Sequence, residues 1–90
     1  MPKIAIYKSF YIFLWSYDLQ ERRHVHITKG RRGMVNAAKL WLDTLVWFDK
    51  GDLTAKELNE LKKVINKNIG RINTQIDNFA KGKKPTLIKL

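Results

Sequence analysis

Strand-forming residues dominate the first half of the chain. Ile, Tyr, Phe and Trp are frequent over 3–8 and 10–17, which predicts two strands or one long strand with a bend near Ser9. Residues 22–28 alternate between polar and apolar positions, as in a strand whose two faces have different surroundings. A further strand is expected over 34–42. The first half therefore predicts a small antiparallel sheet.

The second half contains the clearest single element. Thr54 and Glu57 have the spacing of a capping box, in which each side chain accepts a backbone N–H of the first helical turn. Apolar residues then recur in steps of three and four, which traces one face of a helix. These residues are Leu58, Leu61, Ile65, Ile69, Ile72, Ile76 and Phe79. We expect one helix from Thr54 to about Ala80, with a bend or break at Gly70, which costs about 1 kcal/mol relative to Ala in a helix interior.

Together these elements predict an α+β fold. A small antiparallel sheet of three or four strands is expected, with one long C-terminal helix packed on it. The 90 residues suffice for one domain, expected over 1–80, followed by a basic C-terminal tail over 81–90. The large aromatic residues are interpreted as core, although a platform for stacking bases would need them on the solvent face. The core candidates are Phe10, Trp15, Trp41, Trp47 and Phe48.

Composition narrows the class of function. The chain has no cysteine, which excludes disulfides and thiolate zinc sites. No apolar run approaches the roughly 20 residues that span a bilayer, and no signal peptide is recognisable. We therefore expect a cytoplasmic protein with no membrane partner and no cofactor. Eighteen Lys and Arg against eight Asp and Glu give a net charge of +10, which suits RNA, DNA or an acidic protein as partner.

The densest group of candidate functional residues lies in segment 22–32. It holds both histidines of the protein and five Arg or Lys in addition. Because alternate residues of a strand share a face, His24 and His26 are expected about 7 Å apart, with Arg22 beside them. Guanidinium groups bind phosphate oxygens in a bidentate manner. The predicted nucleic-acid contacts are Arg22, Arg23, Lys29, Arg31 and Arg32, with Lys83 and Lys84 of the tail adding reach.

The two histidines admit three interpretations. As catalytic residues, His24 and His26 would cleave RNA by general acid–base catalysis without a metal, among cations that stabilise a charged transition state. As metal ligands they would need a carboxylate such as Asp18 or Glu21, and the flanking arginines oppose a bound cation. As structural residues they would hydrogen-bond within the turn or contact phosphate. Whether the protein is an enzyme stays open at this point.

Three motifs, in this order and spacing, resemble a small bacterial family catalogued as domain of unknown function 4160. They are the segments 21–26 (ERRHVH), 38–43 (AKLWLD) and 53–58 (LTAKEL), and the resemblance extends over residues 1 to about 80. Two departures stand out. Arg22 and Arg23 replace two prolines that usually precede the histidines, which makes this chain more basic there. Ile76 stands where a tryptophan is common.

The resemblance implies a class of function. Genes of this family often lie beside another small gene, in arrangements that resemble toxin–antitoxin pairs. A component of a toxin–antitoxin-like system is therefore implied, and the charge favours the basic toxin, acting on or binding RNA. Two alternatives stay open: a non-catalytic nucleic-acid-binding regulator or antitoxin, and a protein-interaction domain that docks an acidic partner such as a cognate antitoxin.

Overall fold

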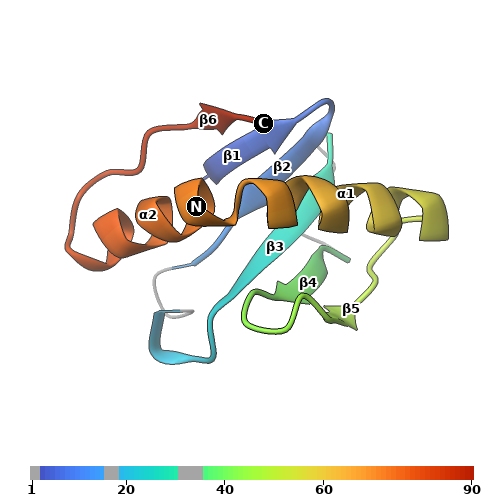
Figure 1. The fold of residues 1–90 in the computed structure, drawn as a ribbon, viewed down its shortest axis with the longest axis horizontal. Helices are drawn as coiled ribbons and strands as arrows, with labels where there is room; N and C mark the ends of the chain where they lie inside the picture. Colours follow the sequence, from blue (N-terminus) through green and yellow to red (C-terminus); the bar gives the residue numbers. More distant parts are fainter. Residues whose placement is uncertain (1–2, 16–18, 31–35) are drawn as a thin grey trace.

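Six strands and two helices make up the described part of the chain, residues 3–15, 19–30 and 36–90 of the computed structural model (Figure 1). In chain order they are β1 (Lys3–Tyr7), β2 (Phe10–Phe13), β3 (His24–Lys29), β4 (Ala38–Trp41), β5 (Trp47–Asp49), α1 (Ala55–Lys67), α2 (Ile69–Ala80) and β6 (Ile88–Lys89). The strands form one sheet in the order β5-β4-β3-β2-β1-β6. The helices follow one another across one face of it (Figure 1).

The sheet combines two kinds of pairing. β1 to β5 pair antiparallel, each with the next along the chain. The first pair is joined by the two-residue turn Lys8–Ser9, where Lys8 has a φ of 52°, as two-residue hairpin turns require. β1 and β2 therefore form a hairpin and not one bent strand, and residues 16–17 of the expected second strand lie outside the described residues. β6 returns from the end of α2 and pairs parallel with β1.

The predicted sheet was wrong in size and in kind. Three or four antiparallel strands were expected, whereas the described residues form a six-stranded mixed sheet. The two strands that were not counted are β5 and β6, which are three and two residues long. Alternation of polar and apolar residues becomes recognisable only over about four residues or more. Both strands are too short to show it. Segment 81–90, expected as a tail, contains β6.

The predicted single long helix was also wrong, because α1 ends at Lys67 and α2 begins at Ile69. Between them Asn68 leaves helical geometry, with φ −111° and ψ 20°. Its side-chain Nδ2 donates to the Val64 carbonyl oxygen at 2.9 Å, and an amide side chain that bonds the local backbone competes with regular helix. A break was expected at Gly70. It lies two residues earlier, at Asn68.

The start of α1 and the apolar stripe confirm the remaining helix predictions. Thr54 Oγ1 accepts the Glu57 backbone N–H at 3.2 Å, and Glu57 Oε1 accepts the Thr54 backbone N–H at 2.9 Å. The stripe faces the sheet and forms the main core with the inward side chains of the strands. The core members on the helices are Leu61, Ile65, Ile72 and Ile76.

The aromatic core candidates divide between the two faces of the sheet. Phe10 is buried in the main core, and Trp47 packs against it. Trp15 and Trp41 are half-buried, and Phe48 is 64% exposed, so the prediction that Phe48 is a core residue was wrong. Its strand places it on the face opposite the helices. Within the part of the chain that the structure describes, no helix has the length and apolar character to cross a membrane.

Candidate nucleic-acid interface

Strand β3 separates two environments, as its alternating pattern predicted. Val25 and Ile27 belong to the main core under the helices. His24 and His26 point to the opposite face, where their rings meet edge to face with centroids 5.0 Å apart. The two side chains therefore share a face, and their rings lean together more closely than the spacing along a strand requires.

Neighbouring strands extend the histidine pair into a row of rings. The register sets Phe13 of β2 opposite His26 and Trp41 of β4 opposite His24. Ring centroids are 5.4 Å apart in the first pair and 5.5 Å apart in the second. Phe13 continues to Trp15 at 6.1 Å, and Trp41 continues to Phe48 at 5.4 Å. With the nearby Tyr11 we call this surface the aromatic face: Tyr11, Phe13, Trp15, His24, His26, Trp41 and Phe48.

Cations lie directly over the rings of the aromatic face. Lys3 Nζ is 4.4 Å from the centroid of Tyr11. The Arg22 guanidinium is 4.5 Å from the centroid of Trp41. Lys39 Nζ is 4.7 Å from Trp41 and 4.8 Å from Phe48. These distances lie within the roughly 6 Å over which a cation is attracted to a ring face. The aromatic face is therefore positively charged as well as apolar.

The rings of the row differ in their exposure to solvent, and the exposed end lies at β5. Phe13 is 1% exposed and His24 2% exposed, so these two rings are closed to a ligand, whereas Tyr11, Trp15 and His26 are half-buried. Trp41 is half-buried, and Phe48 at the end is largely in solvent. The most exposed part of the aromatic face is thus the end formed by Trp41 and Phe48, with Arg22 and Lys39 beside it.

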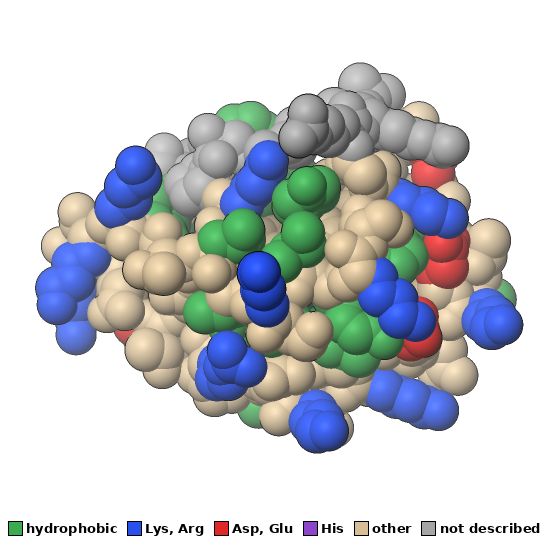
Figure 2. Space-filling view, turned by 90° about the horizontal axis from the view of Figure 1, so that it is seen from above, with side chains coloured by type: hydrophobic (Ala, Val, Ile, Leu, Met, Phe, Trp, Pro, Cys, Tyr) green, Lys and Arg blue, Asp and Glu red, His purple; other side chains and the backbone are tan. Residues whose placement is uncertain are grey.

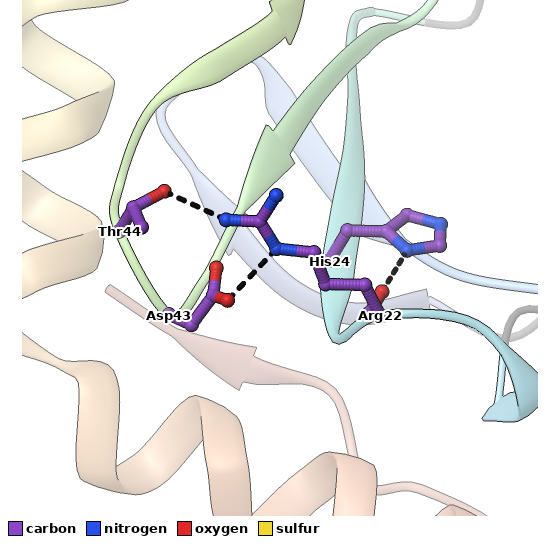
Figure 3. A network of polar contacts seen from close by, with 4 residues as sticks. All are labelled: Arg22, His24, Asp43 and Thr44. Carbon is purple, nitrogen blue, oxygen red and sulfur yellow. Dashed lines mark hydrogen bonds and ion pairs between the residues drawn. The ribbon is translucent and has the colours of Figure 1, made fainter.

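Arg22 lies over Trp41, and Figure 3 shows how Asp43 and Thr44, in the turn that follows β4, hold its guanidinium. Its Nε donates to Asp43 Oδ2 at 2.8 Å, and its Nη2 donates to Thr44 Oγ1 at 3.3 Å. The hydrogen bond from Arg22 lowers the pKa of the Asp43 carboxyl, and the same bond raises the pKa of the arginine. Both groups are therefore charged at neutral pH, and the guanidinium is fixed in position.

His24 is fixed by the backbone of the same arginine. Its Nδ1 lies 2.7 Å from the Arg22 carbonyl oxygen (Figure 3). A carbonyl oxygen only accepts, so Nδ1 must carry the proton in this contact. Its Nε2 lies 4.0 Å from Glu21 Oε2, and Glu21 in turn lies 3.5 Å from Lys39 Nζ. The orientation of this ring is thus set by its neighbours.

The geometry limits what the histidine pair can do. Because the two rings touch, a phosphate cannot lie between them, as cleavage by one acid and one base from opposite sides would require. His26 is half-buried and His24 is buried, so only the first is accessible. The catalytic roles of both stay a prediction. Among the described residues no three His, Asp or Glu side chains cluster as a metal site, and Asp18 lies outside those residues.

The other predicted phosphate contacts do not gather at the histidines. Arg23 points to the helix layer, where its Nη1 donates to Asn73 Oδ1 at 3.1 Å and its Nη2 to Asp77 Oδ1 at 2.9 Å. Lys29 Nζ donates to Glu57 Oε2 at 2.9 Å at the start of α1. These two cations therefore lie on the helix side of the sheet, whereas Arg22 lies on the aromatic face.

The remaining predicted residues lie elsewhere. Lys83 and Lys84 are exposed in the segment between α2 and β6. Arg31 and Arg32 lie outside the described residues. Sequence reasoning missed Lys3 and Lys39, although a signal for the latter was present. Lys39 alternates with Leu40 as His26 alternates with Ile27, and the antiparallel register of β3 and β4 brings both polar positions to one face.

Comparison with known proteins adds a family but no described activity. A family model with the description "Domain of unknown function (DUF4160)" matches residues 9–74. The match covers well over half of the chain and spans β2 to β5, α1 and the first part of α2. No curated protein and no solved structure shows significant similarity to the chain.

Proposed function

The chain belongs to the DUF4160 family, and we propose that it binds single-stranded RNA through the aromatic face, as the basic component of a toxin–antitoxin-like pair. One observation carries this proposal. At the accessible end of the aromatic face, two cations lie within 5 Å of aromatic ring centroids. Rings for bases and cations for phosphates are thus side by side at this end of the sheet.

Each part of this surface suits a part of a nucleotide. Bases stack on aromatic side chains, and this is worth about 1–3 kcal/mol per base. Phe48 offers an exposed ring for that purpose, and Trp41 extends it. Arg22, held beside Trp41 by Asp43 and Thr44, and Lys39 would then contact the phosphates that flank a stacked base. Single strands are favoured because the bases of a duplex already stack on one another.

Charge and burial support binding in preference to cleavage. The net charge of +10 attracts a polyanion from a distance and speeds its association. His24 is buried and holds the backbone of Arg22, which gives it a structural role in this surface. We therefore propose RNA binding without cleavage, with His24 and His26 as part of the binding surface.

A matched pair of substitutions in β5 and the residue before it tests the binding surface. Phe48→Ala removes an exposed ring, whereas Val46→Ala, at a position 53% exposed, removes apolar surface of the same edge without a ring. The probe is a fluorescein-labelled oligouridine of about 12 nucleotides, followed by anisotropy. We expect Phe48→Ala to weaken binding about 10-fold and Val46→Ala to leave it unchanged.

Two results would contradict the proposal. One is equal affinity of the Phe48→Ala and Val46→Ala proteins, because stacking on Phe48 would then contribute nothing. The other is tighter binding of a duplex of the same length than of the single strand. The toxin role has its own test, which is induced expression in a bacterium. Growth arrest by the unmodified protein and its loss in Phe48→Ala are expected, and growth at the normal rate in both would remove that role.

A further inference from the structure

Among the described residues, β6 forms an outer edge of the sheet, with β1 as its one neighbouring strand. β6 pairs with β1 in the register Ala5↔Ile88 and Ile6↔Lys89, and the Leu90 N–H donates to the Ile6 carbonyl oxygen at 2.8 Å. In a parallel ladder alternate residues bond to the same neighbour. Ile88 and Leu90 therefore bond toward β1. Leu87 and Lys89 direct their N–H and C=O groups away from the sheet.

The side chains around this edge are basic and partly apolar. Leu87 is 44% exposed. The lysines of the segment, Lys81, Lys83, Lys84 and Lys89, are all exposed. Figure 2 looks down on this edge and shows Lys and Arg side chains spread over the surface, with carboxylates gathered mainly toward one end. β6 and the segment that leads to it from α2 thus combine outward-directed backbone groups, one exposed apolar side chain and an excess of positive charge.

This edge is already formed in the isolated chain. The buried side chain of Gln75 donates through Nε2 to the Ile4 carbonyl oxygen at 3.1 Å and also to the Thr86 carbonyl oxygen. One amide of α2 therefore ties β1 to the residues that precede β6. A segment fixed in this way loses little conformational entropy when a ligand binds, which favours affinity.

We infer that the β6 edge binds an extended acidic segment of a partner protein, which adds to the sheet as a further strand. Backbone groups of the added strand would pair with those of Leu87 and Lys89, which is the usual basis of strand addition. Its carboxylates would meet the lysines. The same lysines oppose pairing with a second copy of this chain, because charged edge residues repel their own kind. The surface is separate from the aromatic face, so this inference does not depend on RNA binding.

Two substitutions of Lys89 distinguish the contribution of backbone hydrogen bonds to peptide binding from that of charge. Lys89→Pro removes both the charge and the outward N–H, and proline is tolerated where the N–H of an edge strand faces solvent. Lys89→Gln removes the charge alone. The probe is a fluorescein-labelled peptide of about eight residues in which Glu alternates with Val. We expect Lys89→Gln to weaken binding a few-fold and Lys89→Pro to weaken it at least 10-fold, with both proteins still folded by circular dichroism.

A second measurement uses the unmodified protein and so does not depend on how a variant folds. N-methylation of alternate peptide residues blocks one hydrogen-bonding edge of the peptide, and N-methylation of the intervening residues blocks the other. We expect one of these two peptides to lose binding and the other to keep it. Equal binding of both peptides, or equal affinity of Lys89→Pro and Lys89→Gln, would overturn strand addition. Two further results would contradict an acidic protein segment as the ligand of this edge. One is displacement of the peptide by oligouridine. The other is a dimer of the protein in sedimentation velocity that dissociates when the peptide is added.

Discussion

His24 occupies the middle of the row of rings, in contact with His26 on one side and Trp41 on the other. Its side chain is out of solvent, and its Nδ1–H is donated to the Arg22 carbonyl oxygen. Removing the ring would leave both a cavity between aromatic neighbours and a carbonyl without this donor. Each of these losses is costly in a packed environment.

The resulting prediction concerns stability. His24→Ala should lower the free energy of unfolding by about 2–4 kcal/mol, measured by urea denaturation at pH 7. His26→Ala, which truncates a half-buried ring, should cost less than half as much. A His24→Ala protein that unfolds at the same urea concentration as the unmodified chain would contradict the structural role. Functional assays of the histidines should therefore use His26, since loss of His24 is expected to disturb the whole aromatic face.

At the scale of single residues, alternation was readable from the sequence and burial was not. The order of polar and apolar residues in 22–28 was enough to set His24 and His26 apart from Val25 and Ile27. Alternation is a local property of a strand. Whether His24 is covered depends on the rings opposite it in β2 and β4, and therefore on the strand register, which one sequence does not contain.

Among the elements, α1 was the most predictable, because its signals are local. Its capping box, its apolar stripe and its start all follow from residues within a few positions of one another. The break at Asn68 and the strands β5 and β6 were not predictable. In the first case Asn68 and Gly70 lie two residues apart and both disfavour a helix interior, and in the second a strand of two or three residues exists only through its neighbour.

The start of α1 also predicts how stability changes with pH. The hydrogen bond from Lys29, followed by that from the Thr54 backbone, lowers the pKa of Glu57 below its ordinary value of 4.5. A carboxyl with a lowered pKa in the folded state stabilises the fold above its unfolded pKa. That stabilisation is lost as the pH falls through the lowered value. The urea midpoint of the unmodified protein should thus fall as the pH is reduced from about 5 to below the lowered pKa.

The variant Glu57→Gln isolates this contribution. It should be less stable than the unmodified protein at pH 7, and the difference between the two should shrink on acidification, since the protonated carboxyl and the amide are then both uncharged. Asp43 has a lowered pKa as well, so the variant should keep part of the acid sensitivity. Two stability curves that run parallel from pH 7 down to pH 3 would show that the Lys29–Glu57 pair contributes nothing.

For the molecule as a whole, the net charge can be counted from the sequence, but the positions of the charges on the surface depend on the fold. The excess of Lys and Arg indicated a polyanion or an acidic partner, and three-dimensional structure divides those cations among the aromatic face, the helix layer and the β6 edge. The rings and cations at the accessible end of the aromatic face lie within residues 9–74, which the family model matches. β6 lies outside that match. The proposed RNA-binding surface is therefore within the region that the family model describes, and the β6 edge is not.

Salt dependence of RNA binding is the prediction at this scale. Binding through phosphates releases counterions, so the logarithm of the affinity should fall linearly with the logarithm of the salt concentration. Lys39→Gln should reduce the slope by about 0.7, the value for one phosphate contact on a single strand. Lys62→Gln, which removes an exposed charge from α1, is the matched control and should leave the slope unchanged. Equal slopes in both variants would remove Lys39 from the interface.

The parallel pairing of β6 with β1 also determines the order in which the sheet assembles. β1 to β5 pair as sequence neighbours, whereas β6 meets β1 only after the chain has passed through both helices. Closing that longer loop costs more chain entropy, and a ladder of two residues returns little. Although Gln75 ties the residues before β6 to β1, we expect β6 to be the last strand to dock during folding and the first to detach in the native state. Each detachment uncovers the edge of β1, so hydrogen exchange along β1 measures how often β6 opens, and a ligand held by β6 should slow it.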